Sequence, residues 1–188
     1  MEPPTMYFDP TLQLRSARLV LSPIRAADGP ALFAIQSDPE VMRYWNHPAW
    51  TDPQQAYAQI LDDLAAMRDG TQLKLGIREH ADAALLGICV VFAIDAGSGR
   101  AEIGYNLAPQ AQGKGYMGEA LQCFADHLFD QRGLRRLEAE IDPRNVPSAR
   151  VLERIGFQRE GLLRERWCVG GELSDSALYG LLARERTG

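Results

Sequence analysis

A glycine-containing loop between an extended run and a helical run constrains the fold of this chain more than any other stretch. Residues 100–107 have the pattern of a strand, residues 116–131 that of a helix, and Gly113 and Gly115 lie between them. Glycine has no Cβ, so such a loop can leave its backbone N–H groups exposed. The first turn of a helix adds unpaired N–H groups and the positive end of the helix dipole. The sequence therefore predicts an anion site at this loop, suited to phosphate or pyrophosphate.

Two common phosphate-binding motifs fit the loop poorly. The G-x-x-x-x-G-K-[ST] motif places a hydroxyl on magnesium, whereas Met117 and Gly118 stand where that motif needs other residues. Gly113, Gly115 and Gly118 satisfy G-x-G-x-x-G, but this dinucleotide motif belongs to the first βα turn and needs an acid about 20 residues on. Here the loop follows several expected strands, and Asp130 falls at the end of the next helix. A dinucleotide-binding fold is therefore the weaker alternative.

Length and composition indicate one domain of ordinary type. The 188 residues suffice for a single core, and we predict a domain over residues 11–188 after a flexible N-terminal tail over residues 1–10. The net charge of −5 disfavours a nucleic-acid-binding protein. Without a signal-peptide pattern or an apolar run of about 18 residues, we expect no membrane span and a cytoplasmic location. Three cysteines without a C-x-x-C pair, and no histidine cluster, predict no metal.

Hydrophobic periodicity divides the rest of the chain into strands and helices. Helices are expected over residues 29–36, 53–69, 116–131 and 146–155. Strands are expected over residues 12–21 (with a kink at 16–18), 73–77, 85–94, 100–107, 136–141, 158–169 and 173–182. The strand after the loop helix should run parallel to the strand before the loop. The predicted fold class is α/β (α+β), one domain with a central mixed, mostly antiparallel twisted sheet of about seven strands flanked by helices.

The residues around the loop also resemble a known family. Residues 110–115, Gln-x-x-Gly-x-Gly, resemble the Q/R-x-x-G-x-G/A signature of the GCN5-related N-acetyltransferases (GNAT), whose loop amides hold the pyrophosphate of acetyl-CoA. The segments at residues 101–105, 113–120 and 145–157 look like the RimJ/RimL-type branch, which is best known for acetylating protein N-terminal amines. The resemblance covers residues 14–182. It implies a splay between the strands before and after the loop, where the pantetheine arm would enter.

This resemblance implies acetyl-CoA as the acetyl donor. The loop would hold the pyrophosphate, and backbone groups at the end of the preceding strand would pair with the pantetheine arm. Asn145 would hydrogen-bond the pantetheine or phosphate region, although Asn at a helix start is also an ordinary cap. Lys114 and Arg150 are expected either at the cofactor phosphates or in solvent. The predicted cofactor-binding residues are Tyr105, Asn106, Leu107, Gln112, Gly113, Lys114, Gly115, Tyr116, Met117, Asn145, Ser148 and Arg150.

Acetyl transfer to an amine needs a proton acceptor near the amine, donors for the developing oxyanion and a proton for the leaving thiolate. Glu102, on the strand leading into the loop, is the expected base, directly or through water; the alternative is a solvated glutamate. Ser148 is the expected proton donor to the thiolate, as the resemblance implies, and a helix cap is its alternative. Tyr179 would replace Ser148 only if the last strand lay close. No cysteine lies in these stretches, so no covalent acyl-enzyme is expected.

The acceptor is the open part of the prediction. Tyr44, Trp45, Trp50 and Trp167 are candidates for its wall, with a place in the core as the alternative. The resemblance favours a protein or peptide N-terminal amine of the ribosomal-protein alanine or serine type. The same branch also acts on small amines, polyamines and aminoglycosides, and a non-catalytic acyl-CoA sensor is a further alternative. Dimers are common in this branch, so a homodimer is one expectation for the assembly.

Overall fold

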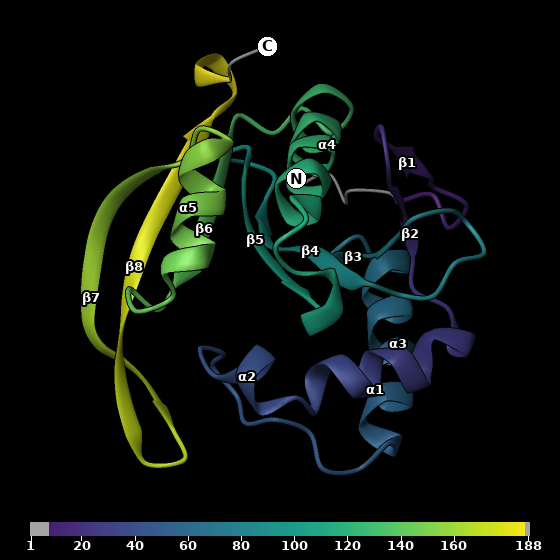
Figure 1. Ribbon diagram of the computed structural model, residues 1–188. Helices are drawn as coiled ribbons and strands as arrows, with labels where there is room; N and C mark the ends of the chain where they lie inside the picture. The colour runs from purple at the N-terminus through teal and green to yellow at the C-terminus, as the bar shows by residue number, and fades with distance from the viewer. Residues whose placement is uncertain (1–7, 187–188) are drawn as a thin grey trace.

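A twisted eight-stranded sheet organises residues 8–186, the part of the chain that the computed structural model describes (Figure 1). In chain order the strands are β1 (Leu14–Arg15), β2 (Val20–Pro23), β3 (Leu73–Arg78), β4 (Gly87–Asp95), β5 (Arg100–Leu107), β6 (Arg136–Ile141), β7 (Gln158–Val169) and β8 (Glu172–Leu182). Their spatial order is β1-β2-β3-β4-β5-β6-β8-β7. All neighbours are antiparallel except β5 and β6, which are parallel as predicted.

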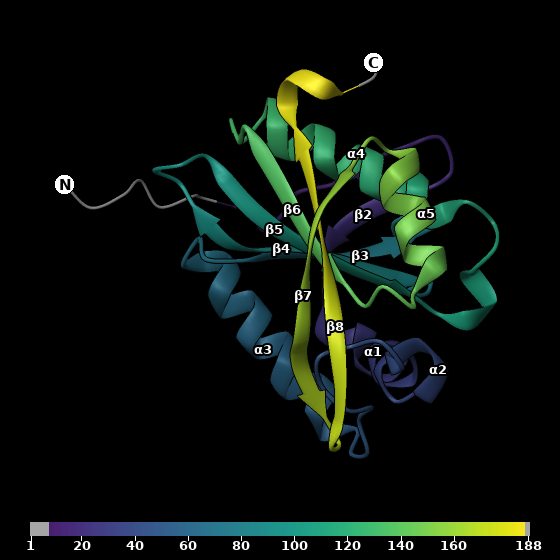
Figure 2. The ribbon, with the colours of Figure 1, turned by 90° about the vertical axis from the view of Figure 1, so that its left-hand side faces the viewer.

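Helices cover both faces of this sheet. They are α1 (Gly29–Gln36), α2 (Pro39–Met42), α3 (Gln54–Arg68), α4 (Tyr116–Asp130) and α5 (Val146–Arg154). Figure 2 shows α4 and α5 on one side of the sheet and the first three helices on the other. The apolar face of α4 drives this packing, because its residues Leu121, Phe124 and Leu128 are fully buried in the main core cluster. No helix among the described residues is both long and apolar enough to cross a membrane.

The two parallel strands separate after a short paired region, as predicted. β5 and β6 pair from Arg100 opposite Arg136 to Glu102 opposite Glu138, and the pairing ends there. Beyond this point β5 stays paired with β4 as far as Leu107, and β6 stays paired with β8 as far as Ile141. Each strand thus follows its other neighbour, and an opening forms between them at their carboxyl ends.

The sheet has one strand more than predicted because the first expected strand is a hairpin. Leu14 pairs with Leu21 across a tight turn. The turn is closed by the Ser16 N–H, which donates to the Leu19 carbonyl at 3.0 Å, and by the Leu19 N–H, which donates to Ser16 Oγ at 3.1 Å. A serine that bonds locally in this way favours a turn over an extended strand. The predicted kink is therefore a reversal of the chain.

One residue of the predicted N-terminal tail, Phe8, packs in the core. The first seven residues of the tail lie outside the described residues, but Phe8 is 2% exposed and belongs to the main core cluster. The guanidinium of Arg132 lies 5.5 Å from the centroid of its ring. The buried ring of Phe8 therefore holds this end of the chain, because an aromatic side chain in the core fixes the chain at that residue.

Candidate active site

The loop between β5 and α4 has the backbone conformation that its glycines allow. Gly113 has φ +74° and Gly115 has φ +78°, both in the left-handed region. A Cβ added at Gly113 would meet no described atom within 4 Å, so the loop borders open space. Helix α4 begins directly after Gly115, and no described side chain caps its N-terminus. The loop and the helix start therefore present free N–H groups to an anion, as predicted.

Arg18, which the sequence analysis did not single out, lies beside this loop. Its Nη1 donates to the Lys114 carbonyl at 3.0 Å, and its Nε donates to Glu119 Oε2 at 2.7 Å. The guanidinium stacks 4.8 Å from the centroid of the Tyr116 ring, and its Nη2 would lie 3.5 Å from a Cβ at Gly115. These contacts hold a positive charge next to the predicted anion site. Arg18 and Lys114 are 96 positions apart, so no local sequence pattern connects them.

Three other predicted loop residues have structural contacts of their own. Gln112 Nε2 donates to the Leu107 carbonyl at 3.1 Å, which ties the loop to the end of β5. The Tyr116 hydroxyl donates to Glu79 Oε1 at 2.7 Å. Met117 is 7% exposed and packs in the core, so its predicted role in cofactor binding is restricted to its backbone N–H. Among these residues it is the backbone, more than the side chains, that faces the anion site.

A cavity of about 150 Å³ lies where β5 and β6 separate. Glu102 and Tyr105 of β5 line it, together with Glu140 of β6 and Ser148 of α5. The other lining residues that bear on the chemistry are Tyr44, Trp45, Asp142, Asn145, Trp167, Ser174 and Ser176. The structure thus brings together both predicted catalytic residues and three of the four predicted acceptor residues. Trp50 does not line the cavity and packs against a core cluster instead. Glu140 had not been predicted.

Some predicted cofactor residues do not line this cavity. Asn106 and Leu107 are 7% and 8% exposed and have their side chains elsewhere. Neither Oδ1 nor Nδ2 of Asn106 has a hydrogen-bond partner among the described residues. Lys114 is exposed on the loop, with its Nζ 5.9 Å from the Tyr116 ring centroid, and Arg150 is exposed on α5. Contacts of these four residues with a cofactor therefore remain predictions.

Glu102 is the unpaired acid of the cavity. Asp142 is held by Arg144, whose Nη2 lies 2.7 Å from Oδ2. Glu140 is held by Arg166, whose Nε donates to Oε1 at 3.0 Å. No described residue forms a hydrogen bond or ion pair with the Glu102 carboxylate, although that side chain is partly buried. A carboxylate left without a partner at a cavity is free to interact with a bound molecule.

The surroundings of Glu102 make its carboxylate basic. Burial raises the pKa of Glu102 to about 7; the negative charges of Glu140 and Glu138 act in the same direction, against Arg166 and Arg100. Burial disfavours the charged form of a carboxyl group, and nearby like charges do the same. A group with this pKa is ionised in about half of the molecules at neutral pH and accepts protons more readily than an ordinary glutamate.

Tyr105 and Ser148 form a hydroxyl pair at the same cavity. Their oxygens lie 2.7 Å apart. Burial raises the pKa of the Tyr105 phenol far above its ordinary value, so the phenol stays protonated. Asn145 Oδ1 accepts the Ser148 N–H at 3.2 Å, so Asn145 is the cap of α5 and also lines the cavity. Tyr179 donates instead to Glu153 at 3.3 Å and does not line the cavity, which removes it as the alternative to Ser148.

Two separate parts of the chain supply the aromatic wall. Tyr44 and Trp45 follow α2, and Trp167 lies on β7. These three side chains are partly exposed at the cavity, so the alternative of a place in the core is wrong for them. Arg144 connects Tyr44 with the start of β8, because its guanidinium lies 5.8 Å from the centroid of the Tyr44 ring and its Nη1 donates to Glu172 at 2.7 Å. The described residues contain no group of three or more His, Cys, Asp or Glu side chains suited to a metal.

A family model decides what kind of protein has this loop and cavity. The model described as "Acetyltransferase (GNAT) domain" matches residues 18–158. The chain belongs to the GNAT family. It is an N-acetyltransferase, and GNAT enzymes use acetyl-CoA as the acetyl donor.

Relatives and solved structures agree with this assignment. The chain is 37% identical over 177 residues to the uncharacterized N-acetyltransferase p20 of Bacillus licheniformis, covering 93% of this chain and 98% of that protein. It is 26% identical over 121 residues to the [ribosomal protein uS5]-alanine N-acetyltransferase of Escherichia coli, covering 64% and 62%. Mycobacterium smegmatis RimJ, solved in complex with CoA-disulfide, superimposes with a TM-score of 0.81 at 28% identity, covering 94% and 88%. The RimJ-like resemblance is therefore confirmed.

Arg18→Met is expected to raise the KM for acetyl-CoA about two- to fivefold and to leave kcat unchanged. The substitution keeps the length of the side chain but removes the charge beside the loop, and exposed charges contribute modestly. Steady-state kinetics with varied acetyl-CoA measures the effect. Arg15→Met is the control, since Arg15 is exposed on β1 and bonds Gln13. Equal KM values for the two variants would show that Arg18 has no part in donor binding.

Ser148→Ala is expected to lower kcat roughly tenfold and Tyr105→Phe severalfold, both with little change in the KM for acetyl-CoA. The first loses the proton donor, which a water molecule can replace in part; the second loses only the partner that orients the Ser148 hydroxyl. CoA thiol release measures both rates. Ser98→Ala, in the turn between β4 and β5, is the control. A kcat unchanged in Ser148→Ala would exclude this serine as the proton donor.

Proposed function

We propose that this GNAT enzyme acetylates a primary amine by direct attack on acetyl-CoA, and that its acceptor is a protein or peptide N-terminal amine. The observation that carries the proposal is the unpaired Glu102 carboxylate, which has a pKa of about 7 and shares a cavity with the Tyr105–Ser148 hydroxyl pair. The cavity therefore offers both a base and a proton donor. Direct acyl transfer to an amine requires these two groups.

Each proton in the proposed reaction has a group to take it. The amine enters as an ammonium ion and gives one proton to Glu102, directly or through water. Its nitrogen then forms a bond to the acetyl carbon, and the bond from that carbon to sulfur breaks. Ser148 gives its hydroxyl proton to the leaving thiolate and recovers one from the nitrogen, so that Ser148 is unchanged. The products are the amide, the CoA thiol and the proton on Glu102, which solvent removes.

The donor side is assigned from the glycine loop and β5. We assign the pyrophosphate to the N–H groups of residues 113–117, the pantetheine arm to the backbone of residues 105–107, and Asn145 to the same arm. Backbone N–H groups of β5 beyond Glu102 lack strand partners on β6, so donors are available there for the carbonyl oxygen in the transition state. The assignment of the pyrophosphate to this loop is supported by the exposure of the loop, because its glycines leave space for the phosphates.

The acceptor class is the finer part of the proposal. An N-terminal amine is supported by the similarity to the uS5-alanine enzyme of Escherichia coli. A small amine is the second candidate, because the cavity of about 150 Å³ with its aromatic side chains would enclose a short alkylammonium group. Both acceptors are cations near neutral pH. A CoA-binding sensor without catalysis is the remaining alternative, and we propose an enzyme because of the base and the hydroxyl pair.

CoA thiol release with acetyl-CoA tests the proposal. The acceptor panel contains short peptides with free N-terminal alanine or serine, the same peptides with blocked N-termini, polyamines and aminoglycosides. Turnover with the free but not the blocked peptides is expected, with a new amide on the terminal nitrogen by mass spectrometry. Turnover with polyamines or aminoglycosides but with none of the peptides would show that the acceptor is a small amine and not an N-terminal amine. CoA binding by calorimetry without turnover on any amine would favour the sensor.

A further inference from the structure

A bulge in β7 brings two neighbouring side chains to one acceptor atom. Leu163 pairs with Ser176 and Trp167 pairs with Ser174, so residues 164–166 of β7 oppose the single residue Asp175 of β8. Glu165 has φ +51°, in the left-handed region, and its N–H donates to Asp175 Oδ1 at 2.8 Å. Strained backbone of this kind persists only where surrounding contacts determine it, and bulges redirect side chains.

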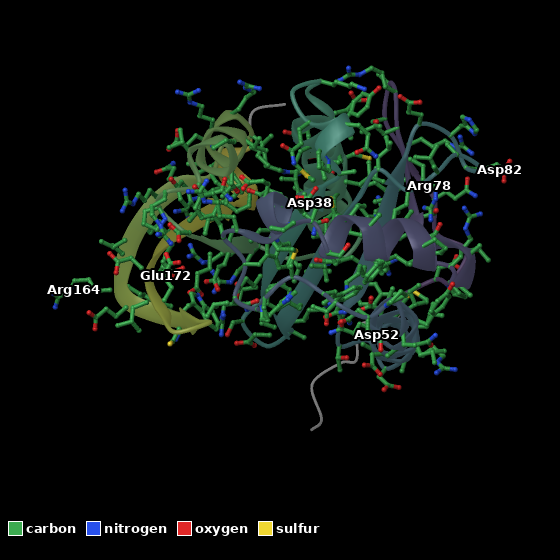
Figure 3. All side chains as sticks on the ribbon, turned by 60° about the horizontal axis from the view of Figure 1, so that its bottom comes forward. Asp38, Asp52, Arg78, Asp82, Arg164 and Glu172 are labelled. Atoms are coloured by element: carbon green, nitrogen blue, oxygen red, sulfur yellow. The ribbon has the colours of Figure 1, made fainter. Side chains whose placement is uncertain are left out.

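The redirected side chains both hold Glu140. Arg166 Nε donates to Glu140 Oε1 at 3.0 Å, and Trp167 Nε1 donates to the same oxygen at 3.1 Å. Consecutive strand residues ordinarily point to opposite faces, so this shared contact depends on the bulge. Figure 3 shows Arg164, two residues earlier, pointing away from the hairpin toward solvent. The bulge thus turns Arg166 and Trp167 toward β6 while Arg164 stays outside.

Two serines of the intervening strand line the same cavity. β8 lies between β7 and β6 in the sheet, and the β8 residues that line the cavity are Ser174 and Ser176. The indole of Trp167 reaches Glu140 from across β8, beside these short side chains. Glu140 itself is on β6, two positions beyond the last residue paired with β5. Its carboxylate is therefore held at the opening between the two strands.

One oxygen of Glu140 is left for a ligand. Arg166 and Trp167 both donate to Glu140 Oε1. No described residue donates to the other oxygen, Oε2. Glu140 lines the same cavity as Glu102, whose carboxylate has no described partner. The cavity lining from the α2 side, residues 44–46, contains no charged side chain. Two carboxylates with free oxygens therefore face a cavity that aromatic rings partly enclose.

The charges around Glu102 come from three strands. β6 contributes Glu140 and Glu138, β7 contributes Arg166, and β5 contributes Arg100. Burial is the main cause of the raised pKa of Glu102; among the charges, each of the two glutamates acts on it more strongly than either arginine. The local field at Glu102 is therefore negative, and it favours a cation at the position next to this carboxylate.

We propose that Glu140, held by Arg166 and Trp167, is a positioning residue that binds the acceptor as an ammonium ion and directs its proton to Glu102. The inference rests on the proposed function, because it assigns this cavity to the acceptor. Glu140 keeps its place through the two β7 donors, and its free oxygen shares the ammonium group with Glu102. Its negative charge also raises the pKa of Glu102.

Binding of n-butylamine and of n-butanol to the CoA-saturated protein tests the inference. The two probes have nearly the same shape, but only the amine is a cation at pH 7.5. NMR chemical-shift titration is expected to show that the protein prefers the amine roughly tenfold or more, as for hydrogen bonds to charged groups. Glu140→Gln should lose most of this preference, although Gln Oε1 can still accept from Arg166 and Trp167. Equal preference in this variant and in the unaltered protein would overturn the inference.

Glu138→Gln is the matched control, because Glu138 is on the same strand and near Glu102 but does not line the cavity. It should keep the preference for butylamine. The acid limb of kcat/KM should move to lower pH in Glu140→Gln and, by less, in Glu138→Gln, because both negative charges raise the pKa of Glu102; the preference for butylamine is therefore the readout that separates the two residues. If Glu140→Gln does not fold, Trp167→Phe replaces it, and an unchanged amine preference in that variant would also overturn the inference.

The two proposals fail in different ways. Turnover on amines combined with an unchanged amine preference in Glu140→Gln would leave the enzyme activity in place and reject the role of Glu140. No turnover on any amine, combined with a butylamine preference that depends on Glu140, would reject the proposed reaction and support the cation site.

Discussion

Glu102→Gln is expected to lower kcat about 10²- to 10⁴-fold, the usual range for loss of a general base. The amide has nearly the same shape as the carboxylate but cannot accept a proton from the acceptor. Because the glycine loop is untouched, calorimetry should give the same affinity for CoA as in the unaltered enzyme. Glu40→Gln is the control, since Glu40 is an exposed carboxylate on α2. A Glu102→Gln enzyme with full kcat would show that water alone removes the proton.

The pH dependence gives a second readout of the same group. Glu102 has a pKa of about 7, raised from an ordinary value of 4.5. Only the ionised form can act as a base, so kcat/KM should fall as the pH drops below about 7. In Glu102→Gln the remaining activity should lack this limb. A limb that persists unchanged in the variant would have to come from a different group.

The same shift has a cost in stability. A carboxyl group whose pKa is higher in the folded protein binds its proton more tightly there, so it favours folding at low pH and loses that contribution as the pH rises through about 7. Glu102→Gln removes the buried charge. Its melting temperature should therefore exceed that of the unaltered enzyme at pH 8, by more than at pH 5. A functional group that destabilises its own fold is common at active sites.

Local patterns were enough to predict the conformation of the loop to which we assign the donor. Two glycines between a strand and a helix indicate free N–H groups wherever they occur, and the structure has the left-handed loop and uncapped helix start that this pattern requires. Glu102 and Tyr105 could be placed because β5 leads directly into that loop. The splay was also predictable, although only through the family resemblance, since strand pairing is not visible in a single sequence.

The proposed acceptor side depends on contacts that the sequence does not show. Glu140 lies on a strand of alternating residues and is indistinguishable there from Glu138. Glu140 differs from Glu138 in its hydrogen bonds to Arg166 and Trp167. These two residues are 26 and 27 positions away in the chain and reach Glu140 only because of the β7 bulge. Arg18 was missed for the same reason, since its partners are on a distant loop. Charged residues in strands acquire their roles from tertiary neighbours, which local periodicity does not encode.

Gly113→Glu is expected to raise the KM for acetyl-CoA at least about 100-fold while the enzyme stays folded. Two effects add. A residue with a Cβ at φ +74° is strained by about 1–2 kcal/mol, which displaces the loop, and a carboxylate among the N–H groups repels phosphate. There is space for the side chain, because a Cβ at this position meets no described atom within 4 Å. Calorimetry with CoA and steady-state kinetics measure the loss.

Two further variants separate strain from charge. Gly133→Glu has a comparable φ of +67° and equally open surroundings, but it follows the opposite end of α4. It should cost the same stability and leave the KM for acetyl-CoA unchanged. Gly113→Ala adds the strain without the charge, so its KM should lie between those of the unaltered enzyme and Gly113→Glu. If Gly113→Glu bound CoA as well as Gly133→Glu does, the loop could not be the pyrophosphate site, and the donor would have to bind elsewhere along the opening between β5 and β6.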